Sequence, residues 1–179
     1  MTTGQEALHR DDEDEPDAVH LDRIDLEILR LLAGDARLSQ RRIAHEIGTS
    51  PPTVADRVAR LERSGVIRGY RVEIDRSLLG FPLVAYLGVV AIQGPDQADV
   101  VTALRALPEV EEVDVVTGPM DFLVRLRVRS HKHLRDVLFE RIWTISGIDR
   151  TQTFISLGQM EAKSFNVDLV TTMLGEERD

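Results

Sequence analysis

The 179-residue sequence contains no cysteine, and only 4% of its residues are aromatic. The lack of cysteine excludes disulfide bonds, thiolate zinc sites, iron–sulfur clusters and cysteine nucleophiles. No apolar run reaches the roughly 18 residues that a membrane-spanning helix needs, and the N-terminus lacks the basic-then-apolar order of a secretory signal. The sequence therefore predicts a cytoplasmic protein without a membrane partner. With 42% hydrophobic residues, a chain of this length can bury the cores of two domains at most.

Charge is distributed unevenly along the chain, whose formal net charge is −9. Residues 1–20 carry seven acidic residues against one arginine, a net charge of −6. Residues 21–80 reverse the sign, with eleven arginines against nine acidic residues, and residues 81–179 return to a net charge of −5. Every base of the middle segment is arginine, whose planar guanidinium binds phosphate or guanine through two hydrogen bonds. The middle segment is therefore a candidate nucleic-acid surface.

Residues 1–20 have almost no large apolar side chains, so they cannot bury enough surface to offset the entropy of ordering. We predict that they form a disordered acidic tail. Two interpretations of the tail remain open. It is either a solvated leader without a role, or an electrostatic mimic that competes with DNA for the arginine-rich segment.

Three short helices are predicted in the arginine-rich segment from caps and helical periodicity. They span residues 22–34, 39–48 and 50–64, each beginning at an Asp or Ser N-cap, and the third has proline at its first positions. A brief turn between the last two helices and arginines on the outer face of the third are what a helix-turn-helix requires. Alternating β-branched residues over 66–74 predict a strand or wing. Residues 21–74 are therefore predicted to form a winged helix-turn-helix DNA-binding domain.

Residues 75–80 are predicted to be a linker to a second domain, which covers residues 81–179. Its pattern predicts strands at 81–92, 110–116, 122–128 and 148–157, with helices at 96–107 and 130–145. The order βαββαβ is that of a ferredoxin-like sheet with two helices on one face, so the fold class is α+β. We expect the uncovered, apolar sheet face to pair with a second copy in a two-fold dimer.

Three motifs occur in order along the chain. They are Ser-Pro-x-x-Val-x-x-Arg-Val-x-x-Leu-Glu at 50–62, Gly-x-Ile-x-Gly-Tyr at 65–70 and Val-x-x-Gly-x-x-Asp at 115–121. Together they resemble the Lrp/AsnC family of feast-and-famine transcription regulators, over about residues 21–160. The resemblance implies a homo-oligomer that binds double-stranded DNA, with dimers assembling into tetramers or octamers. It also implies a small effector, often an amino acid, that binds between subunits near the Gly-x-x-Asp loop.

The candidate DNA-binding residues lie on the predicted second and third helices and just beyond them. They are Arg41, Arg42, Ser50, Pro52, Thr53, Asp56, Arg57, Arg60 and Arg68. We assign Thr53, Asp56 and Arg57 to base edges, because the N-terminal half of a recognition helix enters the major groove, and the remaining arginines to phosphates. The alternative is that these arginines are solvated or paired with acidic neighbours.

The candidate effector site combines a turn with a free carboxylate and hydroxyls that alternate outward on the last strand. Its residues are Thr117, Gly118, Asp121, Thr151 and Thr153. A carboxylate and hydroxyls can hold an α-ammonium group, although Pro119 removes one backbone N–H that an effector carboxylate could use. The alternative is an ordinary Gly-Pro turn with a capping aspartate. The aromatic pair Phe139 and Trp143 is interpreted as a core or subunit contact.

The sequence offers little for catalysis, so we predict no enzymatic activity and no cofactor. His131 and His133 point apart on a helix, unlike the i, i+4 pair that a metal prefers, so no metal site is expected. A Gly-rich phosphate loop and a Gly-x-Ser-x-Gly elbow are both absent from the sequence. Two alternatives stay open: an effector-independent DNA-organising protein, and an enzyme similar to haem-pathway decarboxylases. The enzyme would need histidine and arginine in a pocket of the second domain.

Overall fold

Three helices follow one another where capping residues predict them. In the computed structural model, which describes residues 19–92, 94, 97–158 and 164–176, they are α1 (Arg23–Gly34), α2 (Gln40–Ile47) and α3 (Pro51–Arg63). The side chains of Asp22, Ser39 and Ser50 cap them, each accepting a backbone N–H of the first turn. Gly48 ends α2 with a φ of 69°, a left-handed conformation that glycine adopts without steric cost.

The three helices share one apolar core. Its buried residues come from all three helices: Ile28, Ile43, Ala44, Val54, Val58 and Leu61. The stripe Val54, Val58 and Leu61 turns one face of α3 inward and leaves the opposite face to solvent. This arrangement confirms the predicted helix-turn-helix.

The segment after α3 differs from the prediction. Residues 66–82, all of which the structure describes, contain neither a helix nor a strand, although alternation predicts a strand over 66–74. The apolar side chains of Tyr70, Val72 and Ile74 are exposed. A strand needs a neighbouring strand for its backbone hydrogen bonds, and none of the strands that the structure describes pairs with these residues.

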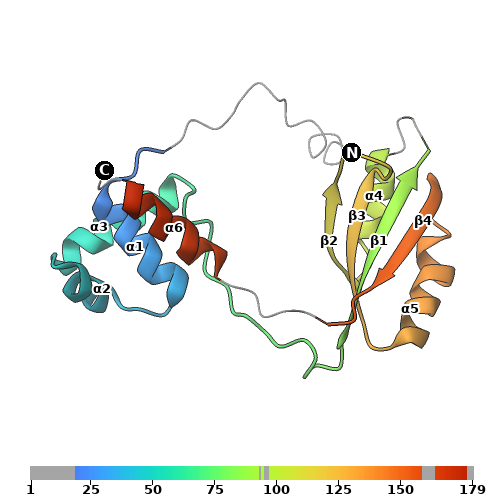
Figure 1. Cartoon of the computed structure of the whole chain (residues 1–179), viewed down its shortest axis with the longest axis horizontal. Helices are drawn as coiled ribbons and strands as arrows, with labels where there is room; N and C mark the ends of the chain where they lie inside the picture. The colour runs from blue at the N-terminus through green and yellow to red at the C-terminus, as the bar shows by residue number, and fades with distance from the viewer. Residues whose placement is uncertain (1–18, 93, 95–96, 159–163, 177–179) are drawn as a thin grey trace. The chain divides into compact units, whose positions relative to one another are not determined.

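The second unit contains the predicted βαββαβ sheet, with element ends within about three residues of those expected. Its strands are β1 (Leu83–Ala91), β2 (Val110–Val115), β3 (Phe122–Val128) and β4 (Ile148–Ile155). They form one antiparallel sheet in the order β2-β3-β1-β4 (Figure 1). The helices are α4 (Gln97–Arg105) and α5 (His131–Val137), and α5 continues as one π-helical turn, Leu138–Ile142.

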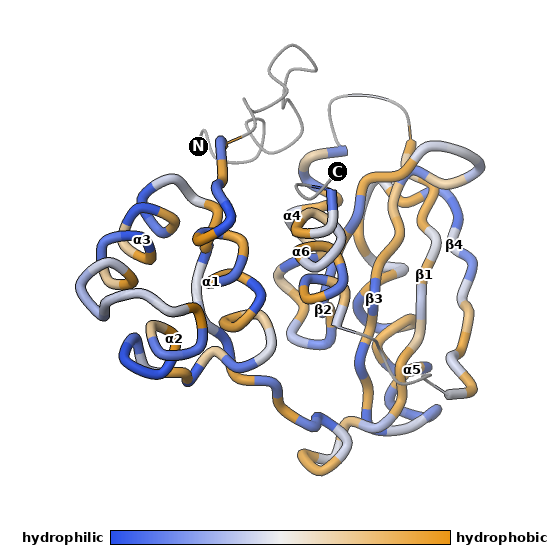
Figure 2. Tube along the Cα trace, turned by 60° about the vertical axis from the view of Figure 1, so that its left-hand side comes forward, coloured by the Kyte–Doolittle hydropathy of each residue, from blue (hydrophilic) through white to orange (hydrophobic). Residues whose placement is uncertain are grey.

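One face of the sheet forms the core with the helices. Buried and half-buried residues alternate along β3, and Phe122, Val124 and Leu126 join Leu104 of α4 and Leu134 of α5 in one apolar cluster. In the second half of β3 this also appears as an alternation in hydropathy, because Arg125 and Arg127 interrupt the apolar residues (Figure 2). The residues between them point to the other face, which no helix of this unit covers.

The last helix, α6 (Phe165–Glu176), differs from the predicted domain boundary. The sequence pattern predicts that every residue from 81 to 179 belongs to the sheet domain. Among the described residues, however, α6 packs against α1, so residues 164–176 belong with 19–73 and the sheet unit comprises 74–158. The physical reason is that α1 offers α6 a second apolar face, as argued below. The predicted acidic tail lies almost entirely outside the described residues.

Candidate effector loop and DNA-binding interface

The Gly-x-x-Asp loop joins β2 to β3. Gly118 has a φ of +125°, and Thr117 beside it is exposed. Asp121 is bound at three points: its N–H donates to Val89 O at 2.9 Å, its carbonyl accepts from Val116 N at 3.0 Å, and its Oδ2 accepts from Ala91 N at 2.8 Å. The loop is therefore tied to the end of β1.

The Asp121 carboxylate is thus not free, and the expectation of a free carboxylate is corrected. The pairing of β1 with β3 ends at Val89 and Phe122, and the register of β1 against β4 shifts between Val90 and Ala91. Ala91 N–H would lose a strand partner there, so the side chain of Asp121 accepts the hydrogen bond instead. This is the capping role that the alternative interpretation describes.

The two candidate threonines lie on β4, on the far side of β1 from the loop. Thr151 pairs with Val89 and Thr153 with Leu87, while Val89 pairs with Phe122 on the other side. Two strand spacings, about 10 Å, therefore separate β4 from β3. Within one chain the structure does not bring the five candidate effector residues into one cluster.

Thr151 has an aromatic partner that the sequence did not suggest. The indole Nε1 of Trp143 donates a hydrogen bond to Thr151 Oγ1 at 3.0 Å. Trp143 also contacts Phe139 in a tilted arrangement, with ring centroids 4.3 Å apart and ring planes at 54°. The side chains of Trp143 and Phe139 are 48% and 58% exposed. This exposure excludes a core role for the pair within the chain, which leaves the subunit contact as a prediction.

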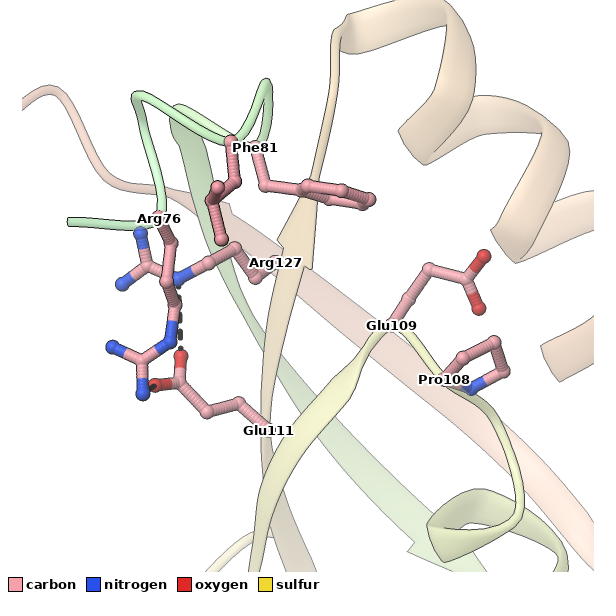
Figure 3. Close-up of a pocket in the computed structure, with 7 residues that line it drawn as sticks. Arg76, Phe81, Pro108, Glu109, Glu111 and Arg127 are labelled. Atoms are coloured by element: carbon pink, nitrogen blue, oxygen red, sulfur yellow. Dashed lines mark hydrogen bonds and ion pairs between the residues drawn. The ribbon is translucent and has the colours of Figure 1, made fainter. Parts of the chain in front are cut away.

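A pocket of about 290 Å³ lies elsewhere in the sheet unit, between the linker and the ends of β2 and β3 (Figure 3). Glu111 is paired within the lining, whereas the partners of Glu109 come from outside it. Glu111 lies 3.1 Å from Arg76 and 3.2 Å from Arg127, and the buried Glu109 binds Arg141 at 2.9 Å. The lining holds two arginines, and His133 contacts the lining residue Glu109 at 3.2 Å.

Two further observations concern the described residues as a whole. They contain no group of three or more His, Cys, Asp or Glu side chains that could hold a metal ion. None of their helices is long and apolar enough to cross a membrane.

The start of α3 is exposed in the DNA-binding unit. Ser50 and Pro52 are exposed, and the half-buried Thr53 donates its N–H to Ser50 Oγ at 3.3 Å. Asp56 and Arg63 lie on the same outer face, opposite Val58. This face has the shape and polarity of a recognition helix.

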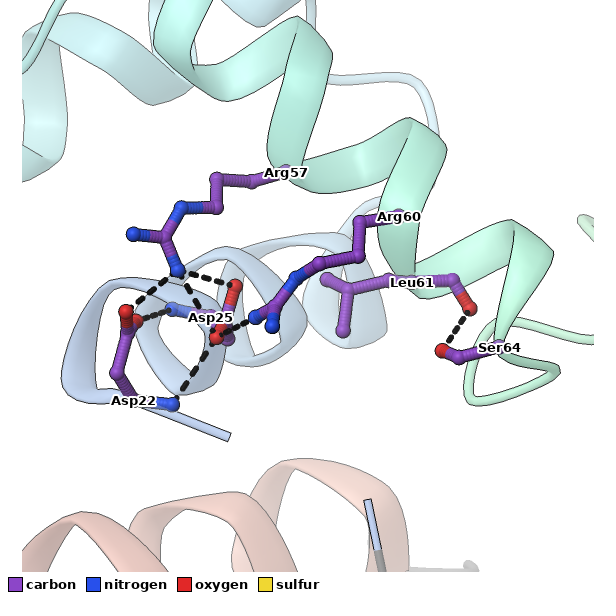
Figure 4. A network of polar contacts seen from close by, with 6 residues as sticks. All are labelled: Asp22, Asp25, Arg57, Arg60, Leu61 and Ser64. Carbon is purple, nitrogen blue, oxygen red and sulfur yellow. Dashed lines mark hydrogen bonds and ion pairs between the residues drawn. The ribbon is translucent and has the colours of Figure 1, made fainter. Parts of the chain in front are cut away.

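Arg57 and Arg60 of α3 turn toward α1, where they meet two carboxylates (Figure 4). Arg57 Nη1 lies 2.5 Å from Asp22 Oδ2 and 3.3 Å from both carboxylate oxygens of Asp25, and Arg60 Nη2 contacts Asp25 Oδ2. The two aspartates also form the capping box of α1, with each side chain accepting the other's backbone N–H at 3.0 Å. The four side chains form one acid–arginine network.

The contacts of the network favour the charged states of Asp22 and Arg57. Asp25 is 0% exposed, and a buried carboxylate is tolerated when it is paired and hydrogen-bonded. Burial alone would raise the pKa of Asp22, but the N–H of Asp25 and the guanidinium of Arg57 outweigh it and lower that pKa. The hydrogen bond to Asp22 in turn raises the pKa of Arg57.

The spacing of Arg57 along α3 indicates that this residue faces a neighbouring helix, although an arginine is usually expected to face solvent. Arg57 follows Val54 by three residues and precedes Leu61 by four, so it lies on the same side of α3 as two core residues. The alternative interpretation, in which arginines pair with acidic neighbours, holds for Arg57 and Arg60, but the partners are on α1.

Other arginines are left available for phosphate. Arg41, Arg63 and Arg68 are exposed and make no ion pair among the described residues. Arg42 pairs with Glu46 of its own helix at 2.7 Å. Such an exposed pair contributes little stability, so it is readily exchanged for a phosphate contact.

A helix-turn-helix unit joined to a ferredoxin-like sheet with a glycine–aspartate loop defines a class of two-domain DNA-binding regulators. Family comparison agrees with this assignment. Residues 21–68 match a winged helix-turn-helix DNA-binding domain, and residues 85–164 match the Lrp/AsnC ligand binding domain. The chain belongs to the Lrp/AsnC family, so it is a DNA-binding transcriptional regulator.

Individual relatives support the family over most of the chain. The leucine-responsive regulatory protein of Haemophilus influenzae is 32% identical over 149 residues, which cover 82% of this chain and 90% of the relative. The structure of Escherichia coli AsnC is 30% identical, with a TM-score of 0.76, over 81% of this chain and 99% of that chain. A Neisseria meningitidis regulator in complex with L-Met, 22% identical, shares the fold with a TM-score of 0.77 over 80% of this chain and 94% of that one.

Proposed function

We propose that the protein is a sequence-specific regulator that inserts the N-terminal half of α3 into the major groove of double-stranded DNA. The observation that carries this proposal is the exposed face of α3, preceded in the chain by Arg41 of α2 and followed by Arg68, both exposed and without an ion pair among the described residues. These two residues, with Arg42, contact phosphates. Pro52, Thr53 and Asp56 contact base edges, and the exposed Ser50 lies at the helix end that faces DNA.

Arg57 reaches DNA through the part of its guanidinium that the network leaves unused. Among the described residues, Asp22 and Asp25 contact only Nη1, so Nε and Nη2 remain as donors there. A side chain held at one nitrogen is ordered before DNA binds, which lowers the entropy lost on binding. Arg60 lies at the border of the same face and binds a phosphate.

The second domain binds a small effector, for which an amino acid is the best candidate. The family match describes this segment as a ligand-binding domain, and the Neisseria meningitidis neighbour is a complex with L-Met. Because Thr117, Gly118 and Asp121 lie far from Thr151 and Thr153 within one chain, an effector that contacts both groups needs a second copy. The sheet face without a helix carries Arg125 and Arg127, so it is less apolar than the sequence pattern predicts. The exposed apolar side chains of Tyr70, Val72 and Phe154 support a homo-oligomer built from dimers that associate into tetramers or octamers.

Recovery of genomic DNA fragments on the purified protein, with and without a pool of amino acids, tests this function. A specific regulator retains a few fragments with an advantage of about 10³-fold or more over bulk DNA, and this advantage persists as salt is raised. Uniform recovery would favour the effector-independent DNA-organising alternative, and no recovery would contradict both. A change in recovered fragments with the pool supports the effector. The family is one of regulators, and we propose no catalytic role.

A further inference from the structure

The C-terminal helix α6 lies outside both segments that match the family. The matched DNA-binding segment ends at residue 68 and the matched ligand-binding segment at residue 164, while α6 begins at Phe165. Even so, α6 packs against α1 of the helix-turn-helix unit, beside which it lies in Figure 1. The two family matches therefore do not account for this contact.

The contact exists because α1 has two apolar faces. Ile28 faces the core shared with α2 and α3. Leu26 precedes it by two residues and so points about 200° away around the helix. Leu26 is nevertheless only 2% exposed, although it does not belong to the three-helix core. Every α1 residue from 24 to 32 is at least half-buried, so a further element must cover the second face.

The sequence of α6 supplies a matching stripe. Val170 is buried at 9% exposure, and Val167, Met173 and Leu174 are half-buried at the helical spacings i−3, i+3 and i+4. The neighbouring Leu169 is 46% exposed, so only one side of α6 is covered. Because all residues of this inward stripe are apolar, burial of apolar surface stabilises the contact between α6 and α1.

The helix that α6 covers also supports the recognition helix. Asp22 and Asp25 at the start of α1 hold Arg57 and Arg60 of α3. In the chain, the sheet unit is inserted between the two parts of the DNA-binding unit, since it begins at residue 74 and α6 follows β4. Docked α6 therefore gives the sheet unit a second covalent connection to the DNA-binding unit, in addition to the linker after α3.

We propose that α6 is a fourth helix of the DNA-binding unit and that its docking on Leu26 of α1 restrains that unit relative to the sheet domain. The effect of this docking on DNA binding rests on the proposed function, whereas the docking itself does not. When both ends of the sheet domain are connected to the DNA-binding unit, that unit and its recognition helix can take fewer orientations relative to the sheet domain. In an oligomer, this raises the effective concentration of the second DNA-binding unit once the first is bound.

The substitution Val170→Asp tests the docking in the full-length protein, with Leu169→Asp as the matched control. Both place a carboxylate at adjacent positions of α6, but only position 170 is buried. We expect α1 amides to exchange hydrogen at least about tenfold faster in Val170→Asp, because a charge replaces a buried apolar contact, and at the wild-type rate in Leu169→Asp. Val170→Ala, which introduces no charge, gives a smaller change of the same sign. Unchanged exchange in both position-170 variants overturns the docking.

The effect on DNA binding is measured as affinity for a genomic fragment that the wild-type protein recovers. We expect Val170→Asp to bind it at least about fivefold more weakly, while Leu169→Asp binds it like the wild type. Faster exchange in α1 with unchanged DNA affinity overturns the restraint and leaves only the docking. If the wild type recovers no DNA, the proposed function fails and the restraint fails with it, whereas the exchange measurement still decides the docking.

Discussion

The guanidinium of Arg57 on α3 lies 2.5 Å from the carboxylate of Asp22, the residue that caps α1. The two residues are 35 positions apart in the sequence. This contact joins α3, the proposed recognition helix, to the first turn of α1. Asp25, fully buried in the same network, binds both Arg57 and Arg60. If Arg57 contacts DNA as proposed, the same side chain serves both the stability of the unit and DNA recognition.

Replacing Asp25 with Asn should destabilise the DNA-binding unit. The change leaves two guanidiniums without their shared charge, which costs about 2–3 kcal/mol after allowance for the partial exposure of both arginines. Urea denaturation followed by circular dichroism measures the loss. Asp56→Asn is the control, since Asp56 is exposed on α3 and should change the free energy of unfolding by less than about 0.5 kcal/mol. Equal midpoints for the two variants would refute a stabilising network.

Stability should fall in acid partly because of Asp22. Its pKa is lowered from the ordinary value of 3.8, with burial opposing the shift and the Asp25 N–H and Arg57 causing it. A lowered carboxyl pKa contributes stability that is complete above the ordinary value and is lost as pH falls through the folded-state value. Thermal midpoints measured between about pH 6 and pH 2 should therefore fall less steeply in Asp22→Asn, which keeps the N-cap. Parallel curves for variant and wild type would contradict this.

Substitutions of Arg57 and Arg41 should distinguish a residue that serves both stability and DNA binding from one that contacts only phosphate. Arg57→Ala should weaken binding of the preferred DNA site by about 1–3 kcal/mol and also lower the unfolding midpoint. Arg41→Ala should leave stability unchanged, because Arg41 makes no ion pair among the described residues, and should reduce the slope of log affinity against log salt by about one. Unchanged affinity of Arg57→Ala for the preferred site would remove Arg57 from the interface.

Substitutions of Asp121 should distinguish its structural role from its proposed role in the effector site. Asp121→Ala removes the acceptor for Ala91 N–H, so it should cost about 1 kcal/mol and abolish the response to the effector while leaving the fold intact. Asp121→Asn keeps an acceptor oxygen and should preserve stability while losing the charge that would hold an α-ammonium group. The shift in DNA affinity on adding amino acids measures the response. Equal shifts in Asp121→Asn and wild type would contradict an ionic role.

Removing the acidic N-terminal segment should strengthen DNA binding if that segment competes for the arginines. A chain that begins at His20 lacks its seven acidic residues and Arg10, so the net charge becomes less negative by six. We expect tighter DNA binding than for the full chain at low salt, and a smaller difference at high salt, where charge is screened over about 10 Å or less. Equal affinities at both salt concentrations would identify the segment as a leader without a role in DNA binding.

Features set by near neighbours in the chain were predictable. The caps Asp22, Ser39 and Ser50 and the end of α2 at Gly48 act within a few residues of themselves, and the alternation along β3 depends only on the pleat of one strand. The βαββαβ order followed from such local patterns, and three ordered motifs indicated the family. Residues 66–74 show the limit of this reasoning: their pattern fits a strand, but strand hydrogen bonds need a partner that the single chain does not supply.

What the sequence determined by itself was the kind and approximate ends of α1 to α5 and of the four strands, and the class of regulator, because these depend on residues close together in the chain. It predicted neither α6 nor the lack of a strand over 66–74. Only the tertiary structure decided which elements meet. It turned Arg57 toward carboxylates 32 and 35 residues away, placed Asp121 on the N–H of Ala91, and packed α6 on the second apolar face of α1. An apolar or charged side chain does not specify its partner. That choice is made when the whole chain finds the arrangement that buries its apolar faces and satisfies its buried charges together.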